Sequence, residues 1–212
     1  MSCLKDEELY RALYEKMPED RRAAADRLRF DGDRRLSVGA FSLLRYALAK
    51  RGEREVFPIF SGEHGKPYFS GRRDIFFNLS HSGDVALCAL SDREIGCDVE
   101  KIRRPPLRVA DKYFSEEERE YVLSAETDDE RRDRFFGVWT LKESVLKASG
   151  DGFTVSASSF SALGVCFPPG TGEAFSPRAA FLTRGYASAF CVRGEETVDP
   201  AIERIDLKAL DC

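Results

Sequence analysis

The spacing of apolar residues changes along the chain, and this change limits the fold more than any other feature of the sequence. Apolar residues recur at helical spacing within residues 4–29 and again from Leu36 to Lys50, which predicts helices there. From Ile75 to Ser80 the residues alternate in the manner of a strand, and residues 85–90 and 94–99 have the same texture. The first part of the chain therefore predicts helices followed by strands.

The same order returns in the second part of the chain. Ser115 followed three residues later by Glu118 predicts a capping box at the start of a helix. A further helix is predicted from Asp129 to Ser149, because acidic residues open it and Gly150 closes it. Residues 153–193 contain short apolar runs between Gly and Pro breaks, which indicates strands.

A basic, proline-containing stretch, Arg103-Arg-Pro-Pro, separates these two parts and marks the predicted boundary. We therefore predict an α+β fold in two similar halves, residues 1–102 and 103–212. A monomer is sufficient for such a two-halved fold.

Composition excludes several classes of protein. The 212 residues are 42% hydrophobic and 33% charged, as in an ordinary globular chain, and the net charge of −4 argues against a nucleic-acid partner. No apolar run approaches the roughly 20 residues of a membrane helix. The acidic start of the chain lacks a signal core, so we expect a cytoplasmic protein. Six cysteines without a C-x-x-C pair argue against a zinc site or a disulfide framework.

Two carboxylates come at the end of an apolar strand. Asp98 and Glu100 are two residues apart, so on a strand they share one face, with roughly 6–7 Å between them. That spacing suits one hard cation, although a solvated strand end has the same pattern.

A second charged pair lies on the predicted helix from Asp129. Glu143 and Lys147 are four residues apart and share a face. An exposed ion pair is one interpretation. However, the large apolar residues Phe136, Trp139 and Leu146 lie on or beside this face, where charged groups are costly unless they bind each other or a ligand.

Three weaker signals carry positive charge or hydrogen-bond donors. His81 lies at a strand end among small hydroxyl residues, in the stretch Asn78–Gly83. Lys66 lies in a rigid turn, Gly65-Lys66-Pro67, and Arg35 lies near a helix start, where anions are favoured. Each also has an ordinary structural or solvated interpretation. Taken together, the three carboxylates suit Mg²⁺ and the cations Arg35, Lys66, His81 and Lys147 suit a multiply phosphorylated substrate, which indicates phosphoryl-transfer chemistry.

Four sequence blocks, in order, resemble the phosphopantetheinyl transferases of the surfactin-synthetase-activating type. The blocks are Gly65-Lys66-Pro67, then Phe77-Asn78-Leu79-Ser80-His81-Ser82-Gly83, then Gly96-Cys97-Asp98-Val99-Glu100, and then Trp139-Thr-Leu-Lys-Glu-Ser-Val-Leu-Lys-Ala-Ser-Gly-Asp-Gly152. The resemblance covers residues 27–155. Cys97 stands where that family usually has a branched aliphatic residue.

This resemblance implies two α+β subdomains related by a pseudo-twofold axis, each a small antiparallel sheet packed with helices, with coenzyme A between them. It implies that Asp98, Glu100 and Glu143 hold Mg²⁺ on the pyrophosphate and that Lys147 contacts the same group. It further implies that Arg35, Lys66, Ser80 and His81 bind the adenosine 3′-phosphate end, while Gly65, Pro67 and Asn78 shape the nucleotide pocket.

The implied reaction moves 4′-phosphopantetheine from coenzyme A to a serine of an apo acyl or peptidyl carrier protein of fatty-acid, polyketide or nonribosomal-peptide synthesis, with Glu143 as the candidate base. A basic stretch, Arg103, Arg104, Arg108 and Lys112, is a candidate docking surface for an acidic carrier. Two alternatives stay open: a non-catalytic relative that binds only coenzyme A or a carrier, and a metal-dependent nuclease.

Overall fold

Helices precede strands in each half of the chain. The computed structural model describes residues 6–53, 55–152, 156–196 and 198–210. The first half contains, in order, α1 (Glu7–Glu15), α2 (Glu19–Asp26), α3 (Asp31–Lys50), β1 (Ile59–Ser61), β2 (Pro67–Phe69), β3 (Phe76–Ser82), β4 (Val85–Ser91) and β5 (Ile95–Lys101). The second contains α4 (Leu107–Tyr113), α5 (Glu116–Leu123), α6 (Asp128–Ser149), β6 (Phe175–Ala179) and β7 (Tyr186–Arg193), with short 3₁₀ turns at Ala157–Ser159 and Leu207–Leu210.

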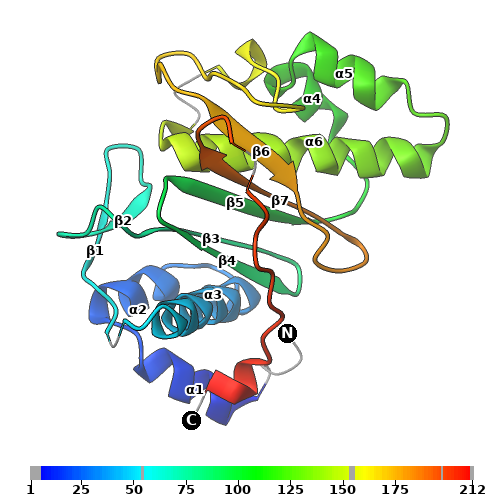
Figure 1. Cartoon of the computed structure of the whole chain (residues 1–212). Helices are drawn as coiled ribbons and strands as arrows, with labels where there is room; N and C mark the ends of the chain where they lie inside the picture. The colour runs from blue at the N-terminus through cyan, green and yellow to red at the C-terminus, as the bar shows by residue number, and fades with distance from the viewer. Residues whose placement is uncertain (1–5, 54, 153–155, 197, 211–212) are drawn as a thin grey trace.

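The strands form small antiparallel sheets. β3 pairs with β4, β1 pairs with β2, and β7 lies between β5 and β6 in a three-stranded sheet. In Figure 1 the long helix α6 runs along the sheet of β5, β7 and β6, and the long helix α3 runs along β3 and β4 on the other side of the molecule. The fold is thus a mixture of helices and small antiparallel sheets, as predicted.

Separate apolar cores lie beneath the two long helices. Leu13, Val38, Phe41 and Leu44 centre the core between α1, α3 and β3–β4, and the C-terminal Leu207 packs into the same core. In the second half, apolar residues of α6 pack against β6, β7 and the turn at Ala157, and against α4 and α5. The C-terminal segment therefore returns from β7 to the first core, as Figure 1 shows.

β3 and β5 lie side by side. Hydrogen bonds between side chains of β3 and the backbone of β5 join them. Asn78 Oδ1, Ser80 Oγ and Ser82 Oγ accept hydrogen bonds from the backbone N–H groups of Cys97, Val99 and Lys101, at 3.0, 3.3 and 3.1 Å. Across the part of the chain that is described, no backbone ladder pairs these two strands. We call this contact the β3–β5 seam. It lies between the sheet of β3 and β4 and the sheet of β5, β7 and β6.

Most predicted elements are present, with differences at short or polar segments. The capping box of Ser115 and Glu118 is confirmed, and Gly150 ends α6 with the left-handed φ of 82°. α3 begins at Asp31 rather than at Leu36, because its first turn is polar and acidic and carries no apolar period. α4, β1 and β2 were not predicted, since seven or three residues show too little periodicity.

The region predicted as helical over residues 4–29 contains two helices, α1 and α2, which are separated at Met17 and Pro18. Residues 4–5 and 153–155 of the predicted segments lie outside the described residues. In the described ranges, no helix is both long enough and apolar enough to cross a membrane.

Candidate active site

A pocket of about 330 Å³ lies where β3, β5 and α6 meet. Residues from all three elements line it: Leu79, Ser80, His81, Asp98, Glu100, Trp139, Glu143 and Lys147. The two carboxylates predicted from strand spacing therefore lie in the same pocket as the Glu and Lys predicted from helical spacing.

Asp98 is the most buried carboxylate of the pocket, with only 4% of its surface exposed. Its Oδ1 accepts hydrogen bonds from Lys147 Nζ at 2.6 Å and from Ser80 Oγ at 2.9 Å. Its Oδ2 is buried and has no hydrogen-bond partner. A buried carboxylate oxygen without a partner is costly, so this atom is a position at which a cation would be stabilised.

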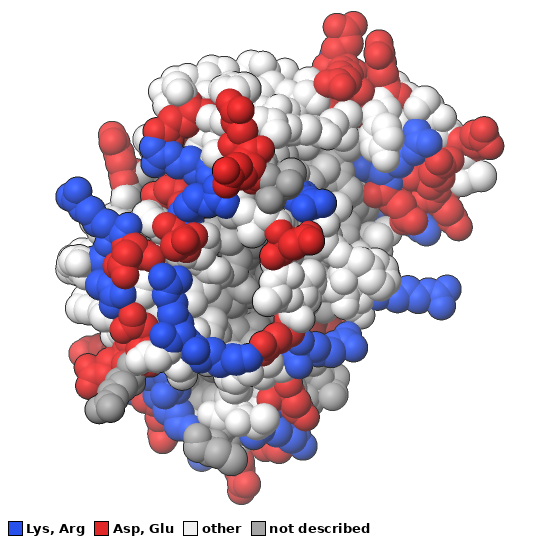
Figure 2. Space-filling view, in the orientation of Figure 1, with Lys and Arg blue, Asp and Glu red and all other residues white. Residues whose placement is uncertain are grey.

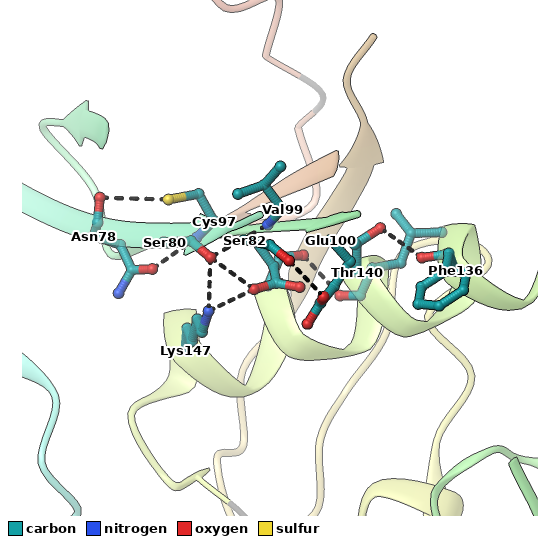
Figure 3. A network of polar contacts seen from close by, with 12 residues as sticks. Asn78, Ser80, Ser82, Cys97, Val99, Glu100, Phe136, Thr140 and Lys147 are labelled. Atoms are coloured by element: carbon teal, nitrogen blue, oxygen red, sulfur yellow. Dashed lines mark hydrogen bonds and ion pairs between the residues drawn. The ribbon is translucent and has the colours of Figure 1, made fainter. Parts of the chain in front are cut away.

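Glu100 lies two residues after Asp98, on the same face of β5. Its Oε2 accepts a hydrogen bond from Ser82 Oγ at 2.9 Å, and Figure 3 shows the two side chains directed toward each other across the seam. Burial and the nearby charge of Asp98 raise the pKa of Glu100, against the opposing effect of the Ser82 hydrogen bond.

Gly96 sets how closely α6 approaches β5. A Cβ atom at this position would lie 2.1 Å from the carbonyl oxygen of Ser144 and 2.4 Å from the backbone nitrogen of Ala148. Only glycine permits this contact, since a methyl group has no room against helix backbone. The close approach brings Glu143 and Lys147 of α6 to the carboxylates of β5.

Glu143 enters the pocket as a half-buried carboxylate. It has no hydrogen bond or ion pair with any residue in the described ranges. Burial, followed by the negative charges of Asp98 and Glu100, raises its pKa to about 7, although Lys147 opposes the shift. A carboxylate with a pKa near neutrality can accept a proton or bind a cation at physiological pH.

Lys147 and His81 supply the positive and neutral donors of the pocket. Burial lowers the pKa of Lys147, but the charge of Asp98 and its hydrogen bond outweigh burial, so the pKa is raised and the ammonium is retained. Burial lowers the pKa of His81, which favours its neutral form. Trp139, the only tryptophan of the chain, packs edge-on against Tyr113 with ring centroids 5.9 Å apart.

The other predicted site residues contribute to the fold or lie elsewhere. Arg35 binds Asp31 at 2.6 Å and also binds Glu7, and its guanidinium stacks over Tyr10. Lys66 binds Glu94, and its ammonium also donates to the carbonyl of Ala148 at 2.5 Å. Among the described residues, the pocket lining does not include five of the predicted site residues: Arg35, Gly65, Lys66, Pro67 and Asn78. Asn78 accepts a hydrogen bond from the backbone nitrogen of Cys97 in the β3–β5 seam.

Sequence reasoning missed a buried ion pair behind the pocket. Lys142 Nζ lies 2.8 Å from Glu118 Oε2, and the two side chains are 1% and 0% exposed. Lys142 also donates to the carbonyls of Ala157 and Phe160, at 2.6 and 2.5 Å. Glu118 was predicted only as a capping residue, and nothing in the sequence indicated its partner 24 residues later.

Comparison with known proteins places this geometry in a family. A sequence model described as the 4′-phosphopantetheinyl transferase superfamily matches residues 94–199, which is half of the chain. The chain belongs to this superfamily. The matched region begins just before β5 and contains Asp98, Glu100, Glu143 and Lys147, so the α6 wall and the β5 wall of the pocket are both parts of the superfamily's own unit.

Individual relatives of this superfamily agree with the match. The chain is 36% identical over 149 residues to a 4′-phosphopantetheinyl transferase of Bacillus pumilus, covering 68% of this chain and 62% of that protein. It is 37% identical over 121 residues to a 4′-phosphopantetheinyl transferase of Bacillus subtilis, covering 56% and 54%. The chain therefore spans about half to three fifths of the length of these relatives.

A solved structure, the holo-[acyl-carrier-protein] synthase of Thermotoga maritima, matches 49% of this chain and 64% of its own, at 22% identity and a TM-score of 0.34. That likeness is too partial to add to the description of the fold.

The residues of the pocket fit a divalent cation. Three carboxylates line it, and Lys147 neutralises one of them through Asp98 Oδ1. Asp98 Oδ2 and the carboxylate of Glu143 are left as oxygen ligands of the type that Mg²⁺ prefers. Within the described residues, no group of three or more His, Cys, Asp or Glu side chains already has the arrangement of a metal site. The carboxylates share the pocket without forming a finished cluster.

Proposed function

We propose that this chain transfers the 4′-phosphopantetheine group of coenzyme A to a serine hydroxyl of an apo acyl or peptidyl carrier protein and releases 3′,5′-ADP. The observation that carries this proposal is the joint lining of one pocket by Asp98, Glu100, Glu143 and Lys147 in a chain of the superfamily. Relatives that match 56% and 68% of this chain are named 4′-phosphopantetheinyl transferases.

Mg²⁺ is the proposed metal, with Asp98, Glu100 and Glu143 as its protein ligands. Support comes from the buried, unpaired Oδ2 of Asp98 and from the excess of negative charge in the pocket. When bound, the metal would neutralise charge on the phosphate oxygens of the substrate. Few protein ligands are needed, because Mg²⁺ keeps several positions for water and phosphate.

Lys147 is proposed to hold the pyrophosphate of coenzyme A. Its side chain is 30% exposed and lines the pocket, although one of its hydrogen bonds goes to Asp98. As the bond from phosphorus to the ADP oxygen breaks, that oxygen takes the electron pair, and a fixed ammonium stabilises the developing charge. The new bond joins the serine oxygen of the carrier to the same phosphorus.

Glu143 is the proposed acceptor of the serine proton. Its pKa of about 7 suits a general base at neutral pH, and its carboxylate has no partner among the described residues. The same properties suit a metal ligand, so Glu143 serves as base, as ligand or as both.

The nucleotide end of coenzyme A is proposed to contact Arg35, Lys66, Ser80 and His81, with Gly65, Pro67 and Asn78 shaping that part of the site. His81 lines the pocket and supports this assignment. The hydroxyl of Ser80 and the charges of Arg35 and Lys66 already have protein partners. Binding of the 3′-phosphate by these groups therefore requires them to exchange a protein partner for the ligand.

We further propose that residues 1–102 and 103–212 form two subdomains related by a pseudo-twofold axis, active as a monomer. Each half has a long helix, α3 or α6, packed on a small antiparallel sheet, which supports the repeat. β5 belongs to the sheet of the second half through its pairing with β7. β5 therefore lies within residues 1–102 in sequence but is part of the sheet of the second half in space. The free thiols of Cys88, Cys97, Cys166 and Cys191 suit the proposed cytoplasmic location.

The carrier is proposed to dock on the basic stretch formed by Arg103, Arg104, Arg108 and Lys112. Arg103 lies close enough to Glu100 for its charge to oppose the rise in the pKa of that carboxyl, which supports a position at the mouth of the pocket. Charge reversal of Arg104 and Arg108 is expected to raise the KM for the carrier and to leave the KM for coenzyme A unchanged. Unchanged values of both constants would remove this docking surface.

Intact mass of an apo carrier protein, incubated with the chain, coenzyme A and Mg²⁺, tests the reaction. We expect a gain of one phosphopantetheine that is lost with EDTA and with Glu143→Gln. Binding of coenzyme A without transfer to fatty-acid, polyketide or peptide carriers would favour the non-catalytic relative. Cleavage of DNA would favour the nuclease. The interspersed Lys, Arg, Asp and Glu on the face in Figure 2 form no basic stripe for a nucleic acid.

A further inference from the structure

Two serines of β3 stand in the same relation to the two carboxylates of β5. Ser80 Oγ lies 2.9 Å from Asp98 Oδ1 and 3.3 Å from the backbone nitrogen of Val99. Ser82 Oγ lies 2.9 Å from Glu100 Oε2 and 3.1 Å from the backbone nitrogen of Lys101. Figure 3 shows Ser80 beside Val99 and Ser82 beside Glu100 along the β3–β5 seam. Each serine thus contacts a carboxylate and the amide of the residue that follows that carboxylate.

The chemistry of these groups fixes the direction of each hydroxyl proton. A backbone N–H can only donate, so the lone pairs of Ser82 Oγ accept from Lys101 N. An ionised carboxylate can only accept, so the hydroxyl proton of Ser82 points to Glu100 Oε2. The amide therefore orients the hydroxyl, and the hydroxyl in turn orients the carboxylate. Oε1 of Glu100 is left as the oxygen that this serine does not use.

The two serines differ in what else they contact. Ser80 also accepts a hydrogen bond from Lys147 Nζ at 3.3 Å, so removal of the Ser80 hydroxyl would disturb the Lys147 ammonium as well as Asp98. Ser82 binds Glu100 and the strand backbone, and it does not line the pocket among the described residues. A change at Ser82 therefore acts on the pocket through the orientation of Glu100.

We propose that Ser82 is a positioning residue that holds Glu100 in the orientation needed to bind the divalent cation. This inference rests on the proposed function, because it assigns a role within the same site. A glutamate side chain has several rotatable bonds, and a hydrogen bond from an anchored hydroxyl restricts them before the metal arrives. Partners of this kind, one shell away from a metal, typically change metal affinity by about 10–100-fold when they are removed.

The test compares variants of the full chain by electron paramagnetic resonance of free Mn²⁺ titrated in the presence of coenzyme A. Ser82→Ala is expected to weaken Mn²⁺ binding by about 10-fold or more, while coenzyme A binding in EDTA stays unchanged. Ser82→Thr keeps the hydroxyl and is expected to bind Mn²⁺ more tightly than Ser82→Ala, close to the wild-type affinity. Should Ser82→Ala fail to fold, Ser82→Cys, with its weaker donor, is expected to weaken Mn²⁺ binding in the same direction.

Ser176→Ala is the matched control. Ser176 is a buried serine of β6 whose hydroxyl donates to the carbonyl of Gly194 at 2.5 Å, at the far edge of the sheet from the seam. Its loss is expected to lower the unfolding free energy without a change in Mn²⁺ affinity. Equal Mn²⁺ affinities for wild type, Ser82→Ala and Ser176→Ala would overturn the role of Ser82 and leave the proposed function intact. A wild-type chain that binds no Mn²⁺ and modifies no carrier would overturn both.

Discussion

Two lysines on α6, five residues apart, each bind a carboxylate, and they differ in what surrounds the pair. Lys142 is 1% exposed, and it binds Glu118 and two backbone carbonyls. Glu118 in turn accepts from the backbone nitrogens of Ser115 and Ala162, both at 2.7 Å. Lys147 is 30% exposed, and its partner Asp98 keeps one buried oxygen without a hydrogen bond.

The pKa values follow the same division. The pKa of Lys142 is lowered, because burial outweighs the attraction of Glu118. The pKa of Lys147 is raised, because the attraction of Asp98 outweighs burial. The Lys142–Glu118 pair is complete within the protein, whereas the pair in the pocket leaves negative charge for a ligand. One helix therefore carries a structural pair on one face and a binding site on another.

The largest expected effect is the difference in unfolding free energy between Lys142→Met and Lys147→Met. Lys142→Met leaves Glu118 buried without its cation, and loss of one partner of a buried pair typically lowers the unfolding free energy by about 3–5 kcal/mol. Lys147→Met is expected to cost less, because the Lys147 side chain is 30% exposed and Ser80 still donates a hydrogen bond to Asp98, while transfer of phosphopantetheine is lost. Urea unfolding of both variants measures the contrast, and equal losses would contradict the division between the two faces.

Gly96→Ala tests whether contact between α6 and β5 builds the pocket. The added methyl group meets the backbone of Ser144 and Ala148, so we expect α6 to shift and the unfolding free energy to fall by about 1–3 kcal/mol. Loss of transfer should exceed what the unfolded fraction explains. Gly137→Ala is the control, since a Cβ at this position of α6 meets no atom within 4 Å; it is expected to retain activity and to stabilise the helix by up to about 1 kcal/mol. A Gly96→Ala variant with wild-type kinetics would show that the close contact is not needed.

Mg²⁺ is expected to raise the unfolding free energy of the chain by binding to the carboxylates of the pocket and not elsewhere. At ten times its dissociation constant a ligand of the native state adds about 1.4 kcal/mol, which differential scanning calorimetry detects as a higher Tm relative to EDTA. Asp98→Asn should abolish the shift, whereas Gly137→Ala should keep it. A shift that survives Asp98→Asn would place the metal elsewhere.

Glu143→Gln is expected to have the smallest effect on stability. Unlike Lys142→Met and Gly96→Ala, it should raise the unfolding free energy. Burial, with the charge of Asp98, raises the pKa of Glu143 from the ordinary 4.5 to about 7. The folded chain therefore binds this proton more tightly than the unfolded chain, so the cost of the charged carboxylate is fully present above about pH 7 and absent below about pH 4.5. In EDTA at pH 8 the variant is expected to gain about 1 kcal/mol, or about 2–4 °C in Tm, with a smaller gain at pH 5. A lower Tm at pH 8 would show that the carboxylate is paired.

Local spacing predicted that each of the two charged pairs in the pocket shares one face of its strand or helix. A period of two placed Asp98 and Glu100 on one face of a strand, and a spacing of four placed Glu143 and Lys147 on one face of a helix, and these four residues line one pocket. The four sequence blocks then indicated the superfamily that the comparisons confirm. These signals depend only on the geometry of a single strand or helix.

What the sequence did not predict depends on contacts between distant segments. The role of Ser82 follows from the adjacency of β3 and β5, which local patterns do not encode. The partner of Lys142 lies on another helix. The partners of Lys66 were not predicted either: its ammonium binds Glu94 and the carbonyl of Ala148 at the end of α6, and its contact with phosphate stays a prediction. Such partners are decided by tertiary packing.

A crystal structure of the chain with coenzyme A and Mg²⁺ tests the central claim most directly. We expect the metal to contact Asp98, Glu100 and Glu143, the pyrophosphate to lie beside Lys147, and the Lys142–Glu118 pair to be unchanged. Coenzyme A bound away from the pocket, or a metal held by none of these carboxylates, would contradict the account.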